Sequence, residues 1–257
     1  MKSEINTVAK KLVTAFDKGK LIAPIPSKFS KNTKSANALR VACESLIKSP
    51  IIGFKAGGTG KAMLKKLGEK EPFYAAIFKK NLLKSNRSIK INKYTLGIEL
   101  EVFYQVKKEF FSISKKITEK NISSVVSHMG SCIEIVGYRQ KKKGLTCLGD
   151  LISDFGANVK FIVGKKQKFK KLKFNNLATS LYNKKSGQVA NGNTKAVYDS
   201  PLKSLVWLLS KIKKDKINLH KDFLVFTGST VGVVPIQKAG LFKGEIKSLG
   251  SVKAKVN

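Results

Sequence analysis

Two glutamates stand two positions apart inside the most strand-like segment of this chain. Residues 94 to 106 read YTLGIELEVFYQV, an apolar and aromatic run that predicts a strand directed into a core. Side chains alternate between the two faces of a strand, so Glu99 and Glu101 share one face. Leu100 and Val102 then point the other way, toward packing. Because two adjacent carboxylates repel, their face is either solvated, paired with lysine, or occupied by a divalent cation.

A third carboxylate occurs in a second strand-like run, SCIEIVGYR, where Glu134 stands between two isoleucines. Two such strands can bring three carboxylates together, and Mg²⁺ prefers oxygen ligands, commonly a few carboxylates. The two histidines, His128 and His220, are isolated in the sequence, and no Cys/His cluster supports zinc. The pattern therefore favours an oxygen-ligated cation, with a solvated strand face as the commoner alternative for an E-x-E pair.

The charge of the chain is strongly positive, at +35 from 51 basic and 16 acidic residues. Arginine occurs only at Arg40, Arg87 and Arg139, so 48 of the basic residues are lysine, and they are scattered. Specific readout of bases and phosphates favours the arginine fork. We therefore expect no specific nucleic-acid partner, although the charge should attract small anionic molecules.

Localisation follows from apolar runs and cysteines. No apolar run approaches the roughly 20 residues that span a bilayer, so no membrane partner is expected. Cys43, Cys132 and Cys147 show no paired spacing, and residues 1–20 contain no continuous apolar stretch of a signal peptide. These features predict a cytoplasmic protein with free thiols.

The arrangement of segments predicts an α+β fold, with a helical portion at 1–50 and a mainly β catalytic domain at 51–257. Helices are expected at about 4–18 and 33–47, a short one at 61–67, and an amphipathic one at 200–213. Residues 107–131 are expected to link two strands. Apart from residues 94–106, strands are expected in EKEPFYAAIF, SCIEIVGYR, FIVG, DFLVFTG, GVVPI and GEIKSLGSVKAKV.

Lys55 is the most interesting of the lysines, in the segment GFKAGGTGKAM. A phosphate loop is excluded, because Lys55 occupies the place of its leading glycine and Ala62 that of its final Ser or Thr. A lysine ahead of a glycine turn can instead be partly buried and directed at a site, although an exposed lysine is commoner. Ser229 is not in a nucleophile elbow, since Thr227 stands two residues before it.

The order of the segments along the chain is more specific than any one motif. The order is GFKAGGTGKAM, EPFYAAIF, GIELEVFYQV, CIEIVGYR, DLISDFGANVKFIVG, SPLKSLVWLLSKI, DFLVFTGSTVGVVPIQKAG, SLGSVKAKV. This order resembles the 2-keto-4-pentenoate hydratase and 4-oxalocrotonate decarboxylase branch of the fumarylacetoacetate hydrolase superfamily, over about residues 51 to 255. That family shows G-x-K-x-G-x-T-S, E-x-E, an A-L-E-I-V-D-S-R-like strand, D-x-x-A-D-N, N-P-x-x-A-V-x-W-L and a final S-G-S strand.

The resemblance implies a fold and a set of site residues. The implied fold is a mixed sandwich or roll of the superfamily's C-terminal-domain type. The implied metal, Mg²⁺ or Mn²⁺, is held by Glu99, Glu101 and Glu134. The implied catalytic residue is Lys55, and the implied substrate-binding residues are Gly228, Ser229 and Arg139.

The implied activity is that of a metal-dependent lyase acting on a small 2-oxo acid in the catabolism of aromatic compounds. A hydratase adds water to a 2-hydroxy-2,4-dienoate to give a 4-hydroxy-2-oxo acid. The alternatives are a 2-oxo acid decarboxylase, an acylpyruvate C–C hydrolase, and a family member without activity. The hydrolase is disfavoured because neither histidine lies in a family motif. A homo-oligomer is expected, alone or with a related family subunit.

The chain departs from the family pattern at its proposed substrate end. Gly137 stands for the Asp of V-D-S-R and Phe155 for the Asn of D-N. Phe73 and Ala75 replace an acidic residue and a glycine, and Gly60 replaces the Ser of G-x-T-S. These changes remove polar groups while leaving the glutamates, and they predict a changed substrate or a weak activity.

Overall fold

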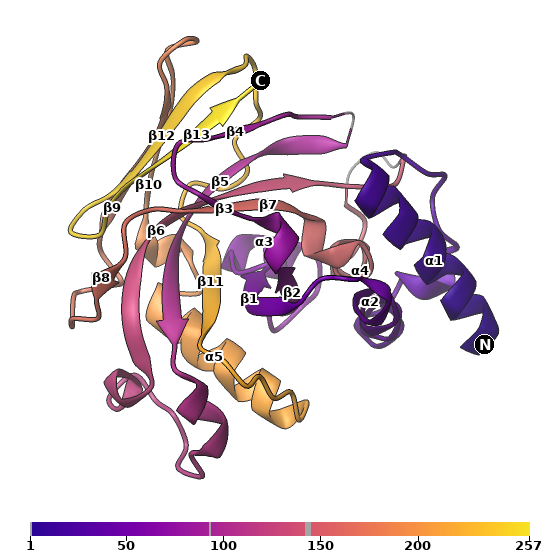
Figure 1. Ribbon diagram of the computed structural model, residues 1–257, viewed down its shortest axis with the longest axis horizontal. Coiled ribbons are helices and arrows are strands. Elements are labelled where there is room, and N and C mark those ends of the chain that lie inside the picture. The colour runs from indigo at the N-terminus through magenta and orange to yellow at the C-terminus, as the bar shows by residue number, and fades with distance from the viewer. Residues whose placement is uncertain (1, 93, 142–144) are drawn as a thin grey trace.

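The N-terminal region is helical in the computed structural model, which describes residues 2–92, 94–141 and 145–257. Helices α1 (Lys2–Lys18) and α2 (Thr33–Leu46) pack against each other at one end of the molecule (Figure 1). The Asn32 side chain accepts a hydrogen bond from the Ser35 backbone N–H at 2.9 Å, which satisfies one free donor of the first turn of α2. Both helices are as predicted from sequence.

A large mixed sheet forms the centre of the molecule, in the order β2-β1-β11-β5-β6-β7-β3, with β8 also paired to β6. Its two longest strands, β5 and β6, lie side by side in the middle as an antiparallel pair. The strands are β1 (Ile51–Gly57), β2 (Phe73–Phe78), β3 (Leu82–Lys84), β5 (Thr95–Val106), β6 (Val126–Gly137), β7 (Asn158–Val163), β8 (Gln167–Lys168) and β11 (Phe223–Ser229).

A smaller five-stranded sheet, in the order β10-β9-β12-β13-β4, packs against β6 at the opposite end from α1 (Figure 1). Its strands are β4 (Arg87–Ile89), β9 (Ala178–Asn183), β10 (Gln188–Asn193), β12 (Gly240–Ile246) and β13 (Gly250–Val256). The two sheets and the flanking helices make the mixed α+β architecture that the sequence predicted.

Three further α-helices connect and cover the large sheet. Ser200 caps the first turn of α5 through the Lys203 N–H, and Pro201 occupies the first position, where no N–H is needed. These helices are α3 (Lys61–Lys66), α4 (Leu148–Ser153) and α5 (Pro201–Lys214). The 3₁₀ turns are Ser27–Phe29, Lys79–Asn81, Lys108–Ser112, Ile122–Ser124, Phe155–Ala157 and Thr194–Ala196. Among the described residues, no helix combines the length and apolar content needed to cross a bilayer.

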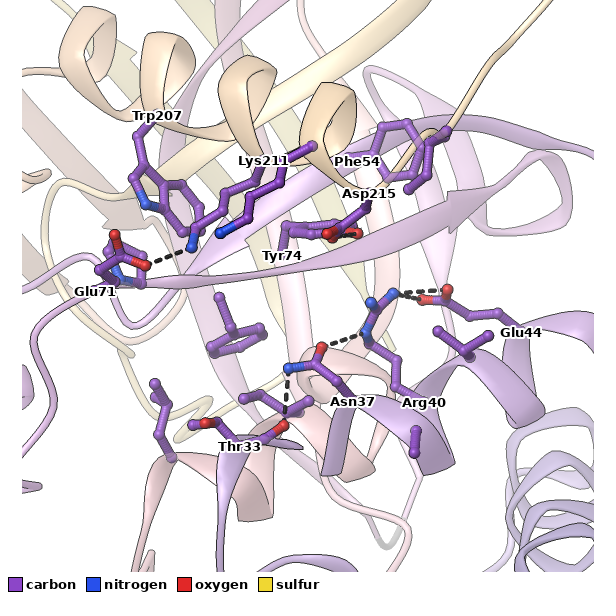
Figure 2. A pocket seen from close by; sticks show the side chains of 18 of the residues that line it. Thr33, Asn37, Arg40, Glu44, Phe54, Glu71, Tyr74, Trp207, Lys211 and Asp215 are labelled. Carbon is purple, nitrogen blue, oxygen red and sulfur yellow. Dashed lines mark hydrogen bonds and ion pairs between the residues drawn. The ribbon is translucent and has the colours of Figure 1, made fainter. Parts of the chain in front are cut away.

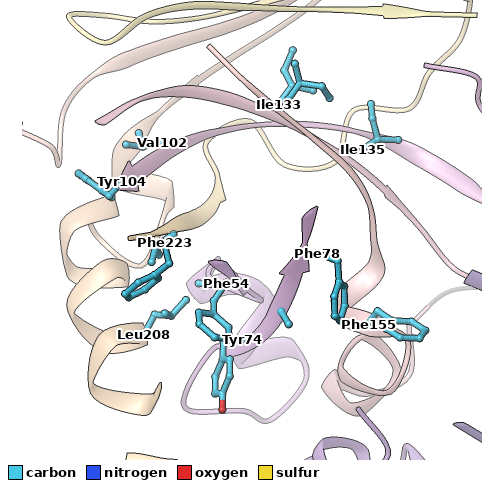
Figure 3. Close-up of a cluster of buried hydrophobic side chains, with 14 of the residues drawn as sticks. Phe54, Tyr74, Phe78, Val102, Tyr104, Ile133, Ile135, Phe155, Leu208 and Phe223 are labelled. Atoms are coloured by element: carbon cyan, nitrogen blue, oxygen red, sulfur yellow. The ribbon is translucent and has the colours of Figure 1, made fainter. Parts of the chain in front are cut away.

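The core forms on the apolar faces of the central strands. Val102 on β5, with Ile133 and Ile135 on β6, is fully buried (Figure 3). Leu100, two residues before Val102, is fully buried on the same face, as strand alternation requires. Aromatic rings continue this core toward α5, where the ring centroids of Phe54 and Phe223 lie 6.1 Å apart. The opposite face of β5 and β6 carries the three glutamates and, beside them, Phe103 and Cys132 of a smaller hydrophobic cluster.

Two predicted segments differ from the structure. GVVPI (232–236) is no regular strand, and only an isolated bridge joins Val234 to Ile98, because Pro235 has no N–H to continue a ladder. The predicted link 107–131 is shorter than expected, since β6 already begins at Val126. The domain boundary at residue 50 stays a prediction; side chains of α1 and α2 join the same hydrophobic core as the large sheet.

Candidate metal centre

The pairing of β5 with β6 determines where the glutamates meet. Glu99 lies directly opposite Glu134 in the ladder, and Glu101 lies opposite Cys132. On the other side of β5, strand β11 places Ser229 opposite Glu101. Like charges directly across a ladder destabilise it, so this register needs a positive partner.

The three carboxylates converge on one point. One oxygen atom from each of Glu99, Glu101 and Glu134 lies within 4.8 Å of the other two. Glu101 and Glu134 are fully buried, whereas Glu99 is partly exposed. The cluster is therefore open to solvent mainly on the side of Glu99.

Lys55 brings a positive charge to this cluster from β1, which pairs with β11 on the side away from β5. Its ammonium lies 2.7 Å from Glu134 Oε1 and donates to the Gly156 carbonyl at 3.1 Å. Lys55 is only 4% exposed, so this is a buried ion pair and no ordinary surface lysine. The structure thus brings together Lys55 and all three predicted glutamates.

Gly228 meets the cluster through its backbone. Its N–H donates to Glu101 Oε2 at 2.8 Å. Its φ of +110° and a Thr59 hydroxyl oxygen 2.1 Å from any added Cβ both require glycine here. The Ser229 hydroxyl turns aside and donates to the Gly232 carbonyl at 2.8 Å. Substrate binding by Gly228 and Ser229 stays a prediction.

Burial and mutual repulsion raise the pKa of the carboxyl groups. Burial raises the pKa of Glu134 to about 7, against the attraction of Lys55, and Glu99 adds to the rise. The pKa of Glu101 is raised well above its ordinary range, by burial and then by Glu134 and Glu99. Burial alone would lower the pKa of Lys55, but the three carboxylates outweigh it and raise that pKa. One ammonium thus faces three carboxyl groups.

The donor set fits a divalent cation. Glu101 Oε1 and Glu134 Oε2 are buried and have no hydrogen-bond partner among the described residues. Unpartnered buried carboxylate oxygens are costly, and hard cations such as Mg²⁺ and Mn²⁺ prefer such oxygen ligands. The free oxygens of Glu101 and Glu134, and the short distances among all three carboxylates, agree with the predicted ligand roles of Glu99, Glu101 and Glu134. These roles stay a prediction.

We expect the metal-free protein to lose stability as the pH rises. Folded Glu134 keeps its proton up to about pH 7, whereas unfolded it loses it near its ordinary value of 4.5. The folded state therefore binds more protons between these pH values, and Glu134 alone lowers the free energy of unfolding across that window by about 3 kcal/mol. Glu101, whose pKa is also raised, adds to this fall. Urea unfolding in EDTA at pH 5 and pH 8 measures this fall. Glu134→Gln should reduce it, and an unchanged slope in that variant would contradict the assignment.

Arg139 lies apart from the cluster. It is fully buried, and its guanidinium Nη1 lies 2.8 Å from Asp154 Oδ1. Among the described residues it makes no hydrogen bond to Lys55 or to the glutamates. Its predicted contact with substrate is untested.

Most residues that depart from the family pattern are packed among apolar side chains or against backbone. Phe73 and Phe155 are buried in two separate hydrophobic clusters, and Ala75 is buried beside Phe73. An added Cβ at Gly137 would lie 2.2 Å from the Tyr94 carbonyl oxygen, so the backbone here leaves no room for an aspartate. Gly60 has open space around it. The structure thus accommodates these changes without new polar groups.

Two residues that interact with the carboxylate cluster or with Lys55 were not predicted from the sequence. Gly156 offers a backbone carbonyl, which no side-chain motif can reveal. Tyr138 is half-buried; burial, followed by Asp154, Asp150 and Glu99, raises its pKa above the ordinary range. Tyr138 directly follows β6 and stands four positions after Glu134, so strand alternation continued by one residue would place it on the face of Glu134, and this spacing was the available signal.

A separate pocket of about 1180 Å³ lies between α2, α5 and the edge strand β2 (Figure 2). Arg40 pairs there with Glu44, and Lys211 with Glu71. None of the predicted site residues lines this pocket. The carboxylate cluster and this pocket are different features of the molecule.

The α+β fold is shared with two solved enzymes whose structures contain a divalent metal. The magnesium and adipate complex of 4-oxalocrotonate decarboxylase from Pseudomonas putida G7 matches with a TM-score of 0.86, at 17% identity, over 100% of this chain and 98% of that one. Fumarylpyruvate hydrolase from Pseudomonas aeruginosa, with Mn²⁺ and pyruvate, matches with a TM-score of 0.57, at 15% identity, over 81% and 90%.

The sequence comparison is more specific. No family model matches the chain. The 2-keto-4-pentenoate hydratase of Burkholderia vietnamiensis is 23% identical over 206 residues, which cover 79% of this chain and 77% of that protein. The predicted resemblance is therefore confirmed: the chain is related in sequence to 2-keto-4-pentenoate hydratases and shares the fold of the fumarylacetoacetate hydrolase superfamily.

Proposed function

We propose that this protein is a metal-dependent lyase of small 2-oxo acids, and specifically a hydratase of a 2-hydroxy-2,4-dienoate. The observation that carries the proposal is the convergence of three carboxylates with one buried ammonium. Relatives of this chain that are named 2-keto-4-pentenoate hydratase support the choice of a hydratase, and their sequences are 22–23% identical to this one. Such a cluster binds a cation and an anionic substrate at the same place.

The residues that would hold the cation are Glu99, Glu101 and Glu134, and Mg²⁺ or Mn²⁺ suits their oxygen ligands. A bound divalent cation supplies Lewis acidity, which polarises a keto oxygen and stabilises developing negative charge. The complexes of two structural neighbours contain magnesium or Mn²⁺ together with a carboxylate compound. These complexes support the proposed metal and the proposed substrate class.

Lys55 is proposed as the proton-transferring residue. Its pKa is raised by the three carboxylates, so the resting group is an ammonium that stabilises negative charge on the substrate. A cation bound by the same carboxylates would offset their effect on this pKa and favour proton transfer from Lys55. The bonds to Glu134 and to the Gly156 carbonyl fix its direction. The Gly228 N–H holds Glu101 Oε2, while Glu101 Oε1 has no hydrogen-bond partner among the described residues and would be available to a cation.

Decarboxylation of a 2-oxo acid is the second candidate. Loss of CO₂ uses the same stabilisation of negative charge but needs no activated water. Phe73 and Phe155 stand where the resemblance implies polar residues at the substrate end, and the loss of those polar residues weakens the case for water activation, which decarboxylation does not need. An acylpyruvate hydrolase is disfavoured, because neither His128 nor His220 is part of the described carboxylate cluster.

The test is incubation with 2-hydroxypenta-2,4-dienoate and Mg²⁺ or Mn²⁺, followed by the absorbance of the dienol. Decay that needs the metal and is lost in Glu99→Ala supports the hydratase. Release of CO₂ from 4-oxalocrotonate, without hydration of the dienoate, supports the decarboxylase. Bound metal with no turnover of any 2-oxo acid would leave a non-catalytic family member.

The cellular location and the oligomeric state are also proposed. The free thiols Cys43, Cys132 and Cys147 agree with a cytoplasmic location. The positive charge would attract a small anionic substrate. A homo-oligomer is proposed by analogy with the family and is tested by light scattering.

A further inference from the structure

Arg139 and Asp154 form an ion pair that is closed off from solvent, with both residues fully buried. Arg139 Nη1 donates to Asp154 Oδ1 at 2.8 Å and to the Asp154 backbone carbonyl at 3.0 Å. The Arg139 backbone N–H donates to Asp154 Oδ2 at 2.8 Å. The pair therefore fixes the side chain and the backbone of Asp154 together.

The guanidinium also holds the residue that follows Asp154. It lies 5.3 Å from the ring centre of Phe155 and 4.9 Å from that of Phe16 on α1. The rings of Phe155 and Phe16 are themselves 4.6 Å apart. Phe155 is thus packed against Arg139 and against a helix at the same time.

The backbone after Asp154 takes a conformation that few residues adopt. Phe155, Gly156 and Ala157 have φ of +54°, +66° and +62°, three left-handed residues in succession. Left-handed backbone is disfavoured for residues with a Cβ and persists only where the surroundings impose it. The Arg139–Asp154 pair imposes it from one side. From the other, the Asn158 side chain donates to the Ala76 carbonyl at 3.0 Å.

The left-handed loop 155–157 contacts Lys55, the proposed proton donor, through the Gly156 carbonyl. It directs the Gly156 carbonyl at Lys55 Nζ, 3.1 Å away, so that the ammonium is held between this carbonyl and Glu134. We propose that the Arg139–Asp154 pair positions Lys55 through loop 155–157. Arg139 is then a positioning residue and not a contact of the substrate. This inference rests on the proposed function of Lys55.

The test replaces the pair by apolar side chains of similar size, in the double variant Arg139→Met/Asp154→Leu. Replacing both members of a buried ion pair often preserves stability, whereas removing one destabilises strongly. A matched control is Arg40→Met/Glu44→Gln, which removes another buried arginine–carboxylate pair. Glutamine is chosen there because Glu44 also accepts from the Ala76 N–H. The double variant Arg139→Gln/Asp154→Asn, which removes both charges and keeps amide groups at both positions, serves as a second variant if the first does not fold.

We expect kcat of the double variant to fall about 10- to 100-fold, because a small displacement of a catalytic group is enough for such a loss. The KM and the Mn²⁺ dissociation constant should stay unchanged, since substrate and metal contacts are intact. The control pair should keep the wild-type kcat. A wild-type kcat in the folded double variant would overturn the proposal.

A crystal structure of the double variant gives a readout that needs no activity. We expect the distance from Lys55 Nζ to the Gly156 carbonyl to exceed about 3.5 Å, beyond a hydrogen bond. A distance that stays near 3.1 Å would overturn the positioning role. If the wild-type protein turns over no 2-oxo acid, the proposed function fails, and this distance still decides the role of the pair.

Discussion

Lys55→Met is expected to lower kcat about 10²- to 10⁴-fold, the range typical of a lost proton-transferring group. Methionine keeps the length and apolar stem of lysine, so the packing of β1 against β11 should survive. Metal affinity should change far less, because the three glutamates remain. Steady-state kinetics with the dienoate and Mn²⁺ titration of the same sample measure the two effects separately.

The matched control is Lys243→Met, which removes a half-exposed lysine from the smaller sheet. It should leave both kcat and metal affinity unchanged. If Lys55→Met turns over substrate at the wild-type rate, Lys55 has no part in the mechanism. If it instead loses metal binding, its role is to hold Glu134 in place.

Glu101→Gln is expected to lower the affinity for Mn²⁺ by more than about 100-fold, since even outer-shell partners of a metal contribute 10- to 100-fold. The same change should raise, or at least preserve, the stability of the metal-free protein. Glu101 is fully buried, its Oε1 has no hydrogen-bond partner among the described residues, and its pKa is raised, so a permanently neutral amide avoids the cost of ionising this carboxyl group. Isothermal titration with Mn²⁺ and urea unfolding in EDTA provide the two measurements.

A fall in Mn²⁺ affinity without a fall in the stability of the metal-free protein distinguishes a metal ligand from a structural residue. Glu245→Gln, on the exposed side of β12, is the control and should change neither quantity appreciably. Loss of stability together with loss of metal binding would indicate that Glu101 holds the sheet together. Unchanged Mn²⁺ affinity would remove Glu101 from the ligand set.

The helices and the polar face of β5 could be predicted from sequence because their signals are local. Apolar spacing predicted α1, α2 and α5, and strand alternation separated Glu99 and Glu101 from Leu100 and Val102. The β9–β10 hairpin was not predicted, because its sequence is polar and lacks a clear apolar alternation. In the structure its two strands are partly exposed. GVVPI was wrongly predicted as a strand, since its valines indicated β structure and its proline was given too little weight.

By itself, the sequence determined which side chains share a strand face, where α1, α2 and α5 lie, and which family the motifs resemble, whereas the short helix α4 was not predicted. Only the tertiary structure decided that Glu134 pairs across from Glu99, that Lys55 reaches the cluster from β1, and that Arg139 pairs with Asp154. The physical reason is the range of the interactions. Alternation and capping depend on neighbours along the chain, whereas the register between strands and the path of a buried loop depend on packing between distant segments.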